Sequence, residues 1–251
     1  MNRKPVVDVA IIGAGPGGLA AAHALLRLGL SVKVFERARE MRLIGAALGL
    51  FPNAYKALEA IDPELCLQVL NVSVEPTEQI LQNSNGDILF QGLPPFSGLK
   101  AKYGVAKSRV LTEFGGWPEP VEEIVQATDA SRIVERGICD RLPVGHWSQG
   151  RVTLLGDAAH PMRPTLGQGT GMAFEDAYEL SACLESGLNP EEALKKYETE
   201  RIPRSSIIQE RAVAAGERAY KDDRAQQLAK AAKNWTPDEF DDWLYNRHYR
   251  H

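Results

Sequence analysis

A glycine-rich turn directly after an apolar segment is the feature that most restricts how this chain folds. Residues 6–12 read Val-Val-Asp-Val-Ala-Ile-Ile, and Gly13-Ala-Gly-Pro-Gly-Gly18 follows at once. The β-branched run predicts a strand buried on both faces, and the small and apolar residues from Gly17 to Leu28 predict a helix. Residues 31–36 predict a second strand. A strand, a turn, a helix and a strand within about 30 residues form a βαβ unit, so the sequence predicts an α/β fold with a parallel sheet.

The turn matches the pattern G-x-G-x-x-G of dinucleotide-binding folds. Gly13 allows the tight turn, Gly15 allows a pyrophosphate to approach the backbone, and Gly18 allows the helix and strand to pack closely. The N-terminus of the helix offers N–H groups and a positive dipole end to phosphates. Glu36 ends the second strand, where a carboxylate can accept hydrogen bonds from ribose hydroxyls. The segment predicts a dinucleotide site and leaves both FAD and NAD open.

A second glycine-rich cluster follows another apolar run. Residues 151–155 predict a buried strand, and Gly156-Asp157-Ala-Ala-His160-Pro161 continue from it. Asp157 is placed to accept hydrogen bonds from sugar or ribityl hydroxyls. Gly167-Gln168-Gly169-Thr170-Gly171 then open a predicted helix, whose positive end can stabilise negative charge on a reduced ring. A solvated turn with an acidic helix cap is the other interpretation of this cluster.

The remaining elements are predicted from turn signals and periodicity. The Asn85-Gly86 pair predicts a β-hairpin between strands at 77–83 and 87–91. Pro190 opens a charged helix that is expected to end or bend at Pro203. The other predicted elements are a helix at 52–61, a loop at 92–107, a strand at 109–114 and a helix at 118–127.

Taken together, these separated motifs resemble those of the FAD-dependent monooxygenases of the aromatic-hydroxylase type, including the zeaxanthin-epoxidase-like branch. The matching residues are Gly13 to Gly18, Glu36-Arg37, Asp140 to Pro143, Gly156 to Pro161, Gly167 to Gly169, Glu175 to Ala177, Tyr197-Glu198 and Arg201. The resemblance implies a Rossmann-like FAD-binding domain, FAD as cofactor and NAD(P)H as co-substrate. In that family NAD(P)H reduces the flavin, O₂ adds to give a C4a-hydroperoxide, and one oxygen atom passes to a small aromatic or isoprenoid molecule.

The resemblance also assigns site residues. It implies that Glu36 binds the adenosine ribose, that Asp157 binds the ribityl chain or nearby pyrophosphate, and that 167–171 lie beside the isoalloxazine. The expected cofactor-binding residues are Gly13, Gly15, Gly18, Glu36, Arg37, Asp157, Gly167, Gln168, Gly169, Thr170 and Gly171. No side chain is assigned as a catalytic acid, base or nucleophile, and His160 is interpreted as a structural residue of its turn.

The chain departs from this family in its middle. The family carries an Asp-Gly motif in a segment that contacts the cofactor and the pyridine nucleotide, and this chain contains no Asp-Gly dipeptide. Similarity weakens after Ile61 and resumes between Gly104 and Trp117, which indicates an internal deletion. Gly171 stands where family members often carry Asn or Cys. The expected organisation is a first part of the FAD-binding domain at 1–72, a reduced β-sheet remnant of the substrate domain at 73–145, and the second part with C-terminal helices at 146–251.

Composition limits the partners. Lys plus Arg total 29 against 33 Asp plus Glu, a net charge of −4, so nucleic-acid binding by bulk charge is not expected. No segment is apolar over the roughly 18 residues that a membrane span requires. The three widely spaced cysteines show no metal-ligand spacing and indicate a reducing compartment, so a cytoplasmic location is expected.

Two further expectations concern what the deletion does. Missing strands leave sheet edges and apolar faces uncovered, so a dimer or another self-associated form is expected. Loss of the middle region predicts an impaired monooxygenase. Two other functions stay open: a non-catalytic FAD-binding protein, and an NAD-dependent reductase that uses the first motif alone.

Overall fold

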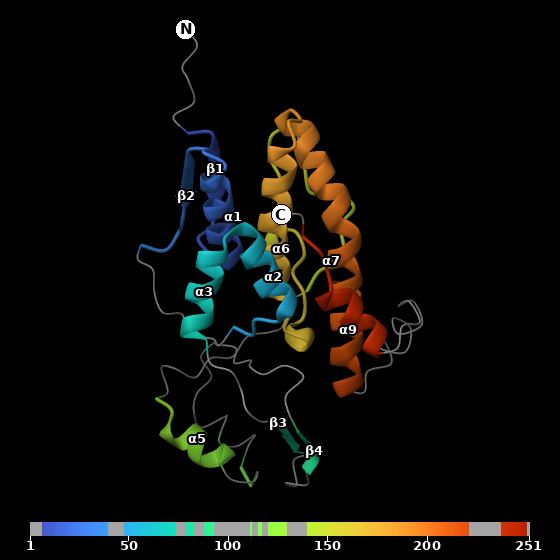
Figure 1. The fold of residues 1–251 in the computed structure, drawn as a ribbon. Helices are drawn as coiled ribbons and strands as arrows, with labels where there is room; N and C mark the ends of the chain where they lie inside the picture. The colour runs from blue at the N-terminus through green and yellow to red at the C-terminus, as the bar shows by residue number, and fades with distance from the viewer. Residues whose placement is uncertain are drawn as a thin grey trace. The chain divides into compact units, whose positions relative to one another are not determined.

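The chain divides into two units, which are described separately (Figure 1). In the computed structural model the described residues are 7–39, 48–73, 79–82, 88–92, 111, 115–116, 120–129, 140–220 and 237–249. The first unit comprises residues 1–41, 50–72 and 139–251, and the second comprises 42–49 and 73–138.

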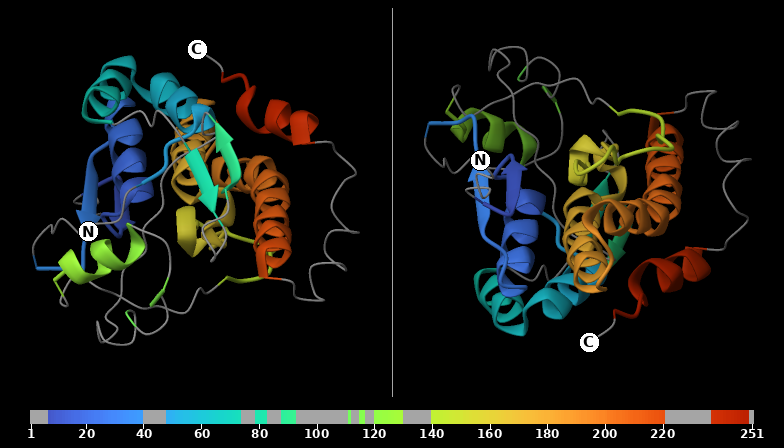
Figure 2. Two further views of the ribbon diagram at one scale, coloured as in Figure 1. Left: turned by 90° about the horizontal axis from the view of Figure 1, so that it is seen from below. Right: turned by 90° about the horizontal axis from the view of Figure 1, so that it is seen from above.

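The predicted βαβ motif begins the first unit. The strands β1 (Val9–Ile12) and β2 (Val32–Phe35) pair in parallel, and the helix α1 (Pro16–Arg27) connects them. In Figure 2 α1 lies between this two-stranded sheet and the later helix α6 (Gly169–Glu185). The arrangement is a Rossmann-like fold that is mostly helical, with a small parallel sheet at one side (Figure 2).

Among the described residues only one face of the sheet is covered, so the prediction of a first strand buried on both faces is wrong. Ile11 is 7% exposed and belongs to the core with α1, whereas Ile12 is 83% exposed and Phe35 is 45% exposed. In the described part of the chain no third strand joins β1 and β2. Alternate side chains of an apolar run are therefore left at the surface, because the second covering layer of a doubly wound sheet is lacking there.

Helices make up most of the rest of the first unit. They are α2 (Pro52–Ile61), α3 (Pro63–Val72), α6, α7 (Pro190–Tyr220) and α9 (Pro237–Tyr245), with short 3₁₀ turns η2 (Gly156–Ala158) and η3 (Pro164–Leu166). α6 is the central helix, because it packs against α1, α2 and α7 and is buried over most of its length. α7 continues through Pro203, so of the two predicted outcomes, an end or a bend, the helix does not end there.

The strand predicted at 151–155 does not form. Val152 makes a single bridge with Gln149, and its side chain is 68% exposed. Leu154 donates its N–H to the Trp147 carbonyl, and the Leu154 carbonyl accepts a hydrogen bond from the Tyr197 hydroxyl. A strand exists through ladder bonds to a neighbour, and here a loop and α7 take those backbone groups instead.

The second unit contains the predicted hairpin strands. β3 (Gln79–Gln82) pairs antiparallel with β4 (Ile88–Gly92), with an irregularity in register after Leu81, while the predicted Asn-Gly turn lies outside the described residues. α5 (Val121–Ala127) lies within the helix predicted at 118–127. Leu111 is the one described residue of the strand predicted at 109–114, and it is helical, so that prediction is wrong there. The loop predicted at 92–107 also lies outside the described residues, apart from Gly92.

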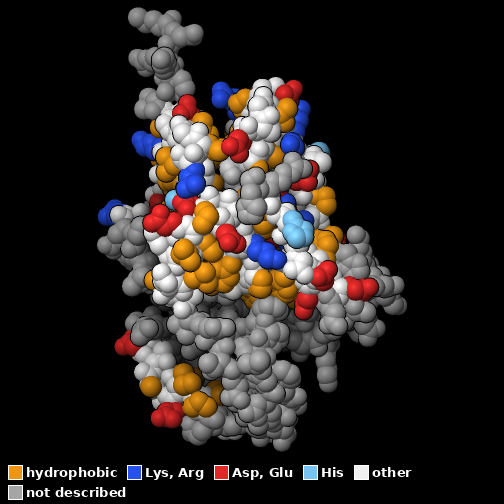
Figure 3. Space-filling view, in the orientation of Figure 1, with side chains coloured by type: hydrophobic (Ala, Val, Ile, Leu, Met, Phe, Trp, Pro, Cys, Tyr) orange, Lys and Arg blue, Asp and Glu red, His pale blue; other side chains and the backbone are white. Residues whose placement is uncertain are grey.

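The surface of the first unit carries apolar side chains outside the sheet as well. Figure 3 shows hydrophobic side chains gathered over α3, where Leu67 is 59% exposed and Leu70 is 45% exposed. None of the helices in the described ranges has both the length and the apolar composition needed to cross a bilayer.

Candidate functional site

At three positions of the first glycine-rich turn, glycine is suited to its place for a different physical reason. Gly13 has φ +104°, which L side chains rarely adopt. A Cβ on Gly18 would lie 2.1 Å from the Gly13 carbonyl oxygen, so no side chain fits between turn and helix. A Cβ on Gly15 would meet nothing within 4 Å, so the backbone at the start of α1 faces open space. A bulky ligand group can therefore reach the backbone at Gly15.

Glu36 joins the end of β2 to this turn. Its Oε2 accepts the Ala14 N–H at 2.9 Å, and its Oε1 accepts the Ala38 N–H at 2.8 Å. These hydrogen bonds, that from Ala14 first, lower the pKa of the Glu36 carboxyl below its ordinary value. Glu36 and the adjacent Arg37 are both exposed. The ionised carboxylate keeps lone pairs with which it can accept further hydrogen bonds from a ligand's hydroxyls.

The second glycine-rich cluster surrounds the N-terminus of α6. Gly156 and Gly167 have φ values of +58° and +63°, and between them η2 presents Asp157 at the surface. A Cβ on Gly171 would lie 3.0 Å from Nδ2 of Asn53, so the glycine at this position makes room for a buried asparagine from α2.

The two clusters meet, although about 140 positions separate them in the chain. A Cβ on Gly17 in α1 would lie 2.9 Å from the Ala173 Cβ in α6, and one on Gly156 would lie 3.5 Å from the same atom. Asp157 lies beside the first residue of α6, with its Oδ1 4.0 Å from where a Cβ on Gly169 would be. The first turn of α1 and the beginning of α6 therefore lie close together, with the Asp157 carboxylate beside the first residue of α6.

Both helix N-termini keep backbone N–H groups that no side chain caps. Neither α1, with Gly15 at its N-cap, nor α6, with Gln168 at its N-cap, has a side-chain hydrogen bond that caps it. Gln168 is 1% exposed, and its Nε2 has no hydrogen-bond partner among the described residues. Uncapped helix N-termini bind anions, and an unpaired buried amide donor calls for an acceptor. The residues fit a dinucleotide with its pyrophosphate at the N-terminus of α1 and a polar ring at the N-terminus of α6, and FAD is one dinucleotide of this kind.

A buried carboxylate supports the turn that carries Asp157. Asp176 Oδ2 accepts the Gly156 N–H at 2.8 Å and lies 2.6 Å from His160 Nε2, and its Oδ1 accepts Arg201 Nε at 2.7 Å. Asp176, His160 and Arg201 are all fully buried. His160 also packs against the Trp147 ring at 5.5 Å, which suits the structural role expected for it.

Glu175, the neighbour of Asp176, accepts hydrogen bonds from side chains of α2, α7 and the segment after α9. It accepts hydrogen bonds from Arg201, Arg204, Arg247 and Asn53, at 2.6 Å, 2.6 Å, 3.2 Å and 3.0 Å respectively. Asn53 donates also to Gln168 Oε1 at 3.0 Å, which links the network to the N-terminus of α6. The sequence motifs included Glu175, Asp176 and Arg201 without a role, and they missed Asn53, Arg204 and Arg247.

Both acids of this network are ionised. Burial raises the pKa of Glu175, but Arg201, Arg204 and Arg247 outweigh burial and lower it to about 2. The pKa of Asp176 is also lowered, because His160 and Arg201 outweigh its burial. Glu175 and Asp176 in α6 pair with Arg201 and Arg204 in α7. Separating these helices would leave buried charges without partners, which costs far more than breaking a surface ion pair, so the network favours the observed packing.

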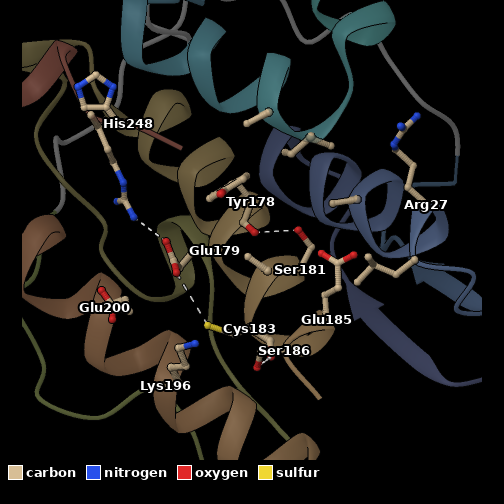
Figure 4. Close-up of a pocket in the computed structure, with 16 residues that line it drawn as sticks. Arg27, Tyr178, Glu179, Ser181, Cys183, Glu185, Ser186, Lys196, Glu200 and His248 are labelled. Atoms are coloured by element: carbon tan, nitrogen blue, oxygen red, sulfur yellow. Dashed lines mark hydrogen bonds and ion pairs between the residues drawn. The ribbon is translucent and has the colours of Figure 1, made fainter. Parts of the chain in front are cut away.

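A groove of about 560 Å³ lies elsewhere, at the carboxyl ends of α1 and α6 (Figure 4). Its walls carry side chains of both signs, among them Arg27, Glu179 and Lys196. None of the predicted cofactor-binding residues lines it. In the described ranges no cluster of His, Cys, Asp and Glu has the geometry to hold a metal ion.

Comparison with protein families matches two segments of the chain. Residues 11–42 match the NAD(P)-binding Rossmann-like domain, and residues 126–212 match the FAD binding domain. These segments contain the two glycine-rich clusters described above.

Curated relatives share part of the chain at substantial identity. Zeaxanthin epoxidase of Oryza sativa subsp. japonica is 42% identical over 124 residues, which are 45% of this chain and 19% of the relative. Aurachin C monooxygenase/isomerase of Stigmatella aurantiaca is 42% identical over 101 residues, 40% of this chain and 26% of the relative. The 3-amino-4-hydroxybenzoate 2-monooxygenase PtmB3 of Streptomyces platensis is 38% identical over 135 residues, 53% of this chain and 34% of the relative. The chain thus matches between about a fifth and a third of each relative's length.

Solved structures share the fold. Klebsiella pneumoniae HpxO, solved with FAD and uric acid, superposes with a TM-score of 0.64 at 19% identity, covering 95% of each chain. CtdE, solved with FAD and a substrate, gives a TM-score of 0.75 at 14% identity, covering 96% of this chain and 95% of that one. Both of these solved complexes contain FAD.

Proposed function

We propose that this chain, which is related to the FAD-dependent monooxygenases through both of its matched segments, binds FAD between the N-termini of α1 and α6. The observation that carries the proposal is the meeting of two uncapped helix N-termini beside Asp157. Bound FAD would supply the redox chemistry, with NAD(P)H as the reductant and O₂ as the oxidant. The protein's part is to bind and orient the cofactor and to exclude water around it.

Each predicted site residue has a part in this proposal. Gly13, Gly15 and Gly18 shape the turn against which the pyrophosphate lies, and Glu36 accepts hydrogen bonds from the adenosine ribose, with Arg37 beside it. Asp157 accepts from the ribityl hydroxyls. The isoalloxazine lies beside the segment Gly167, Gln168, Gly169, Thr170 and Gly171, where the positive end of α6 stabilises negative charge on the reduced ring.

The substrate that we propose is a small aromatic or isoprenoid molecule. The relatives' names include an epoxidase of zeaxanthin and a monooxygenase of 3-amino-4-hydroxybenzoate, which are an isoprenoid and an aromatic compound. We take residues 73–145 as a reduced remnant of the substrate domain, flanked by the two parts of the FAD-binding domain at 1–72 and 146–251. A homodimer and a cytoplasmic location are part of the same proposal; the free thiols of Cys66 and Cys183 support a reducing compartment.

A non-catalytic FAD-binding protein is the second candidate. It is favoured by the absence of any Asp-Gly dipeptide and by the short share of each relative that the chain matches. Oxidation of NAD(P)H by the FAD-loaded protein separates the two candidates, because a non-catalytic protein consumes none beyond the rate of free FAD.

The test of cofactor binding begins with the absorption spectrum and FAD content of the purified full chain, followed by titration with FAD. We expect weak binding at one FAD per chain. Gly15→Ala should obstruct the pyrophosphate, and Asp157→Ala should remove an acceptor worth about 1–3 kcal/mol, which raises the Kd about 5- to 150-fold. Asp157→Ala with an unchanged Kd would contradict the role of Asp157, and a parent chain that binds no FAD would contradict the function.

A further inference from the structure

One oxygen of Asp176 holds both ends of the turn that presents Asp157. Oδ2 accepts the Gly156 N–H at 2.8 Å, and the same atom lies 2.6 Å from Nε2 of His160, four positions later. Asp157 stands between these two attached residues. Within the turn, the His160 N–H donates to the Gly156 carbonyl at 2.9 Å, which closes the loop on itself. The direction of the Asp157 side chain therefore depends on an atom of a fully buried side chain.

Asp176 is itself fixed from the other side. Its Oδ1 accepts Arg201 Nε at 2.7 Å, and Arg201 Nη1 donates to Glu175 at 2.6 Å. The carboxylates and the guanidinium are 0% exposed. Because no water reaches them, a lost hydrogen bond here cannot be replaced by one to solvent.

We propose that Asp176 is a positioning residue for the cofactor: it clamps the turn from Gly156 to His160 and so aims Asp157 at the ligand beside the N-terminus of α6. This inference rests on the proposed binding of FAD and adds to it a residue that acts only through another. It assigns to Asp176 an effect on FAD affinity that should vanish once the Asp157 carboxylate is gone.

The experiment is a double-mutant cycle on the full chain with Asp157→Ala, Asp176→Asn and the double variant, read as Kd for FAD. Asp176→Asn replaces one carboxylate oxygen with an NH₂ group. That group would face another donor, either the Gly156 N–H or Arg201, so one hydrogen bond is lost. We expect each single variant to raise the Kd about 5- to 150-fold. The Kd of the double variant should not exceed that of the single variant with the higher Kd. If the two residues contributed to binding independently, their fold-increases in Kd would multiply in the double variant, and that result would overturn the inference.

Asp62→Asn is the matched control. Asp62 Oδ2 accepts Arg27 Nη1 at 2.9 Å and lies 2.8 Å from His23 Nε2, so one carboxylate oxygen also joins two groups, here towards the C-terminal end of α1. We expect Asp62→Asn to lower the melting temperature and to leave the Kd for FAD unchanged. A rise in Kd equal to that of Asp176→Asn would show a general loss of structure and would overturn the inference.

Gly156→Ala tests the same turn if Asp176→Asn does not fold. Gly156 has φ +58°, and a Cβ there would lie 3.5 Å from the Ala173 Cβ, so the change strains the turn while the charged groups remain. Its Kd should rise, with no further rise when Asp157→Ala is added. A parent that binds no FAD overturns both this inference and the proposed function, whereas a parent that binds FAD with multiplying effects overturns this inference alone.

Discussion

At the scale of single residues, two glycines in one turn have different consequences. A Cβ on Gly18 would lie 2.1 Å from a carbonyl oxygen, and one on Gly15 would meet nothing within 4 Å. We expect Gly18→Ala to lower the free energy of unfolding without FAD by about 1–3 kcal/mol. Gly15→Ala should cost less than about 1 kcal/mol, because Ala caps a helix less well than Gly, and it should weaken FAD binding. Urea denaturation of both variants, without and with FAD, checks the contrast; equal destabilisation would contradict it.

The lowered pKa of Glu175 makes the free energy of unfolding depend on pH. Its folded pKa of about 2 lies below its ordinary value of 4.5, so the stabilisation is present above pH 4.5 and is lost as the pH falls towards 2. We expect the free energy of unfolding to fall by roughly 3 kcal/mol from Glu175 across this range. Urea denaturation at pH 7, 4.5 and 3 measures it.

The control for this prediction is Glu175→Gln. Removing the charge leaves Arg201, Arg204 and Arg247 with less compensation, so we expect a loss of about 3–5 kcal/mol at pH 7. The variant should also lose less stability than the parent between pH 4.5 and pH 3. A parallel acid dependence in the two proteins would contradict the assignment.

The motifs predicted the ligand-facing residues but not the residues beneath them. Gly13, Gly15 and Asp157 stand in short patterns whose spacing carries the chemistry, so they can be found from sequence alone. Asn53 and Arg247 reach Glu175 from 122 positions before it and 72 positions after it, and no local pattern marks such contacts. Their burial follows from packing among α2, α6, α7 and the segment after α9.

At the scale of elements, helices were easier to predict than strands. The α1 and α6 helices form where the apolar periodicity predicts them, and β1 and β2 form on either side of the glycine-rich turn and α1. Residues 151–155 have the composition of a strand but no ladder partner, and composition does not tell whether a partner exists. Pro203 lacks an N–H within α7, yet packing of the helix against α6 and η3 carries it past that position.

The open face of the two-stranded sheet leads to a prediction about association. Ile12 and Phe35 are 83% and 45% exposed on the face away from α1, and apolar sheet faces favour contact between molecules. We expect the parent to associate as its concentration rises, and the double variant Ile12→Thr, Phe35→Thr to remain folded and associate less. Light scattering over a wide concentration range measures this. A parent that is monomeric throughout would contradict the prediction.

Ile11 provides the control on the same strand. It is 7% exposed and packs on the side of α1, so Ile11→Thr should destabilise the fold by about 1–3 kcal/mol. It should leave the surface that associates unchanged. A comparison of melting temperatures for substitutions at positions 11 and 12 thus separates the two faces of the sheet.

At the scale of the whole molecule, the proposed activity is expected to be uncoupled. Oxygen transfer to a substrate needs an enclosed, dry site, and the proposed loss of the middle region would leave this site open to water. We expect slow oxidation of NAD(P)H, with nearly every electron pair ending in H₂O₂. The assay compares NAD(P)H consumed, H₂O₂ formed and oxygenated product for aromatic and carotenoid candidates. Product formed in proportion to NAD(P)H would contradict the prediction.

The long sequence separations between Glu175 and its partners affect how the chain folds during its synthesis. The first glycine-rich turn leaves the ribosome when Glu175, Arg201 and Arg247 have yet to be added, and at about 5–20 residues per second this interval is on the order of tens of seconds. Closing contacts over 122 and 72 positions costs chain entropy before the ion pairs form. We therefore expect the nascent βαβ motif to remain incompletely packed until the segment after α9 has been made, and to be more susceptible to proteolysis during this interval.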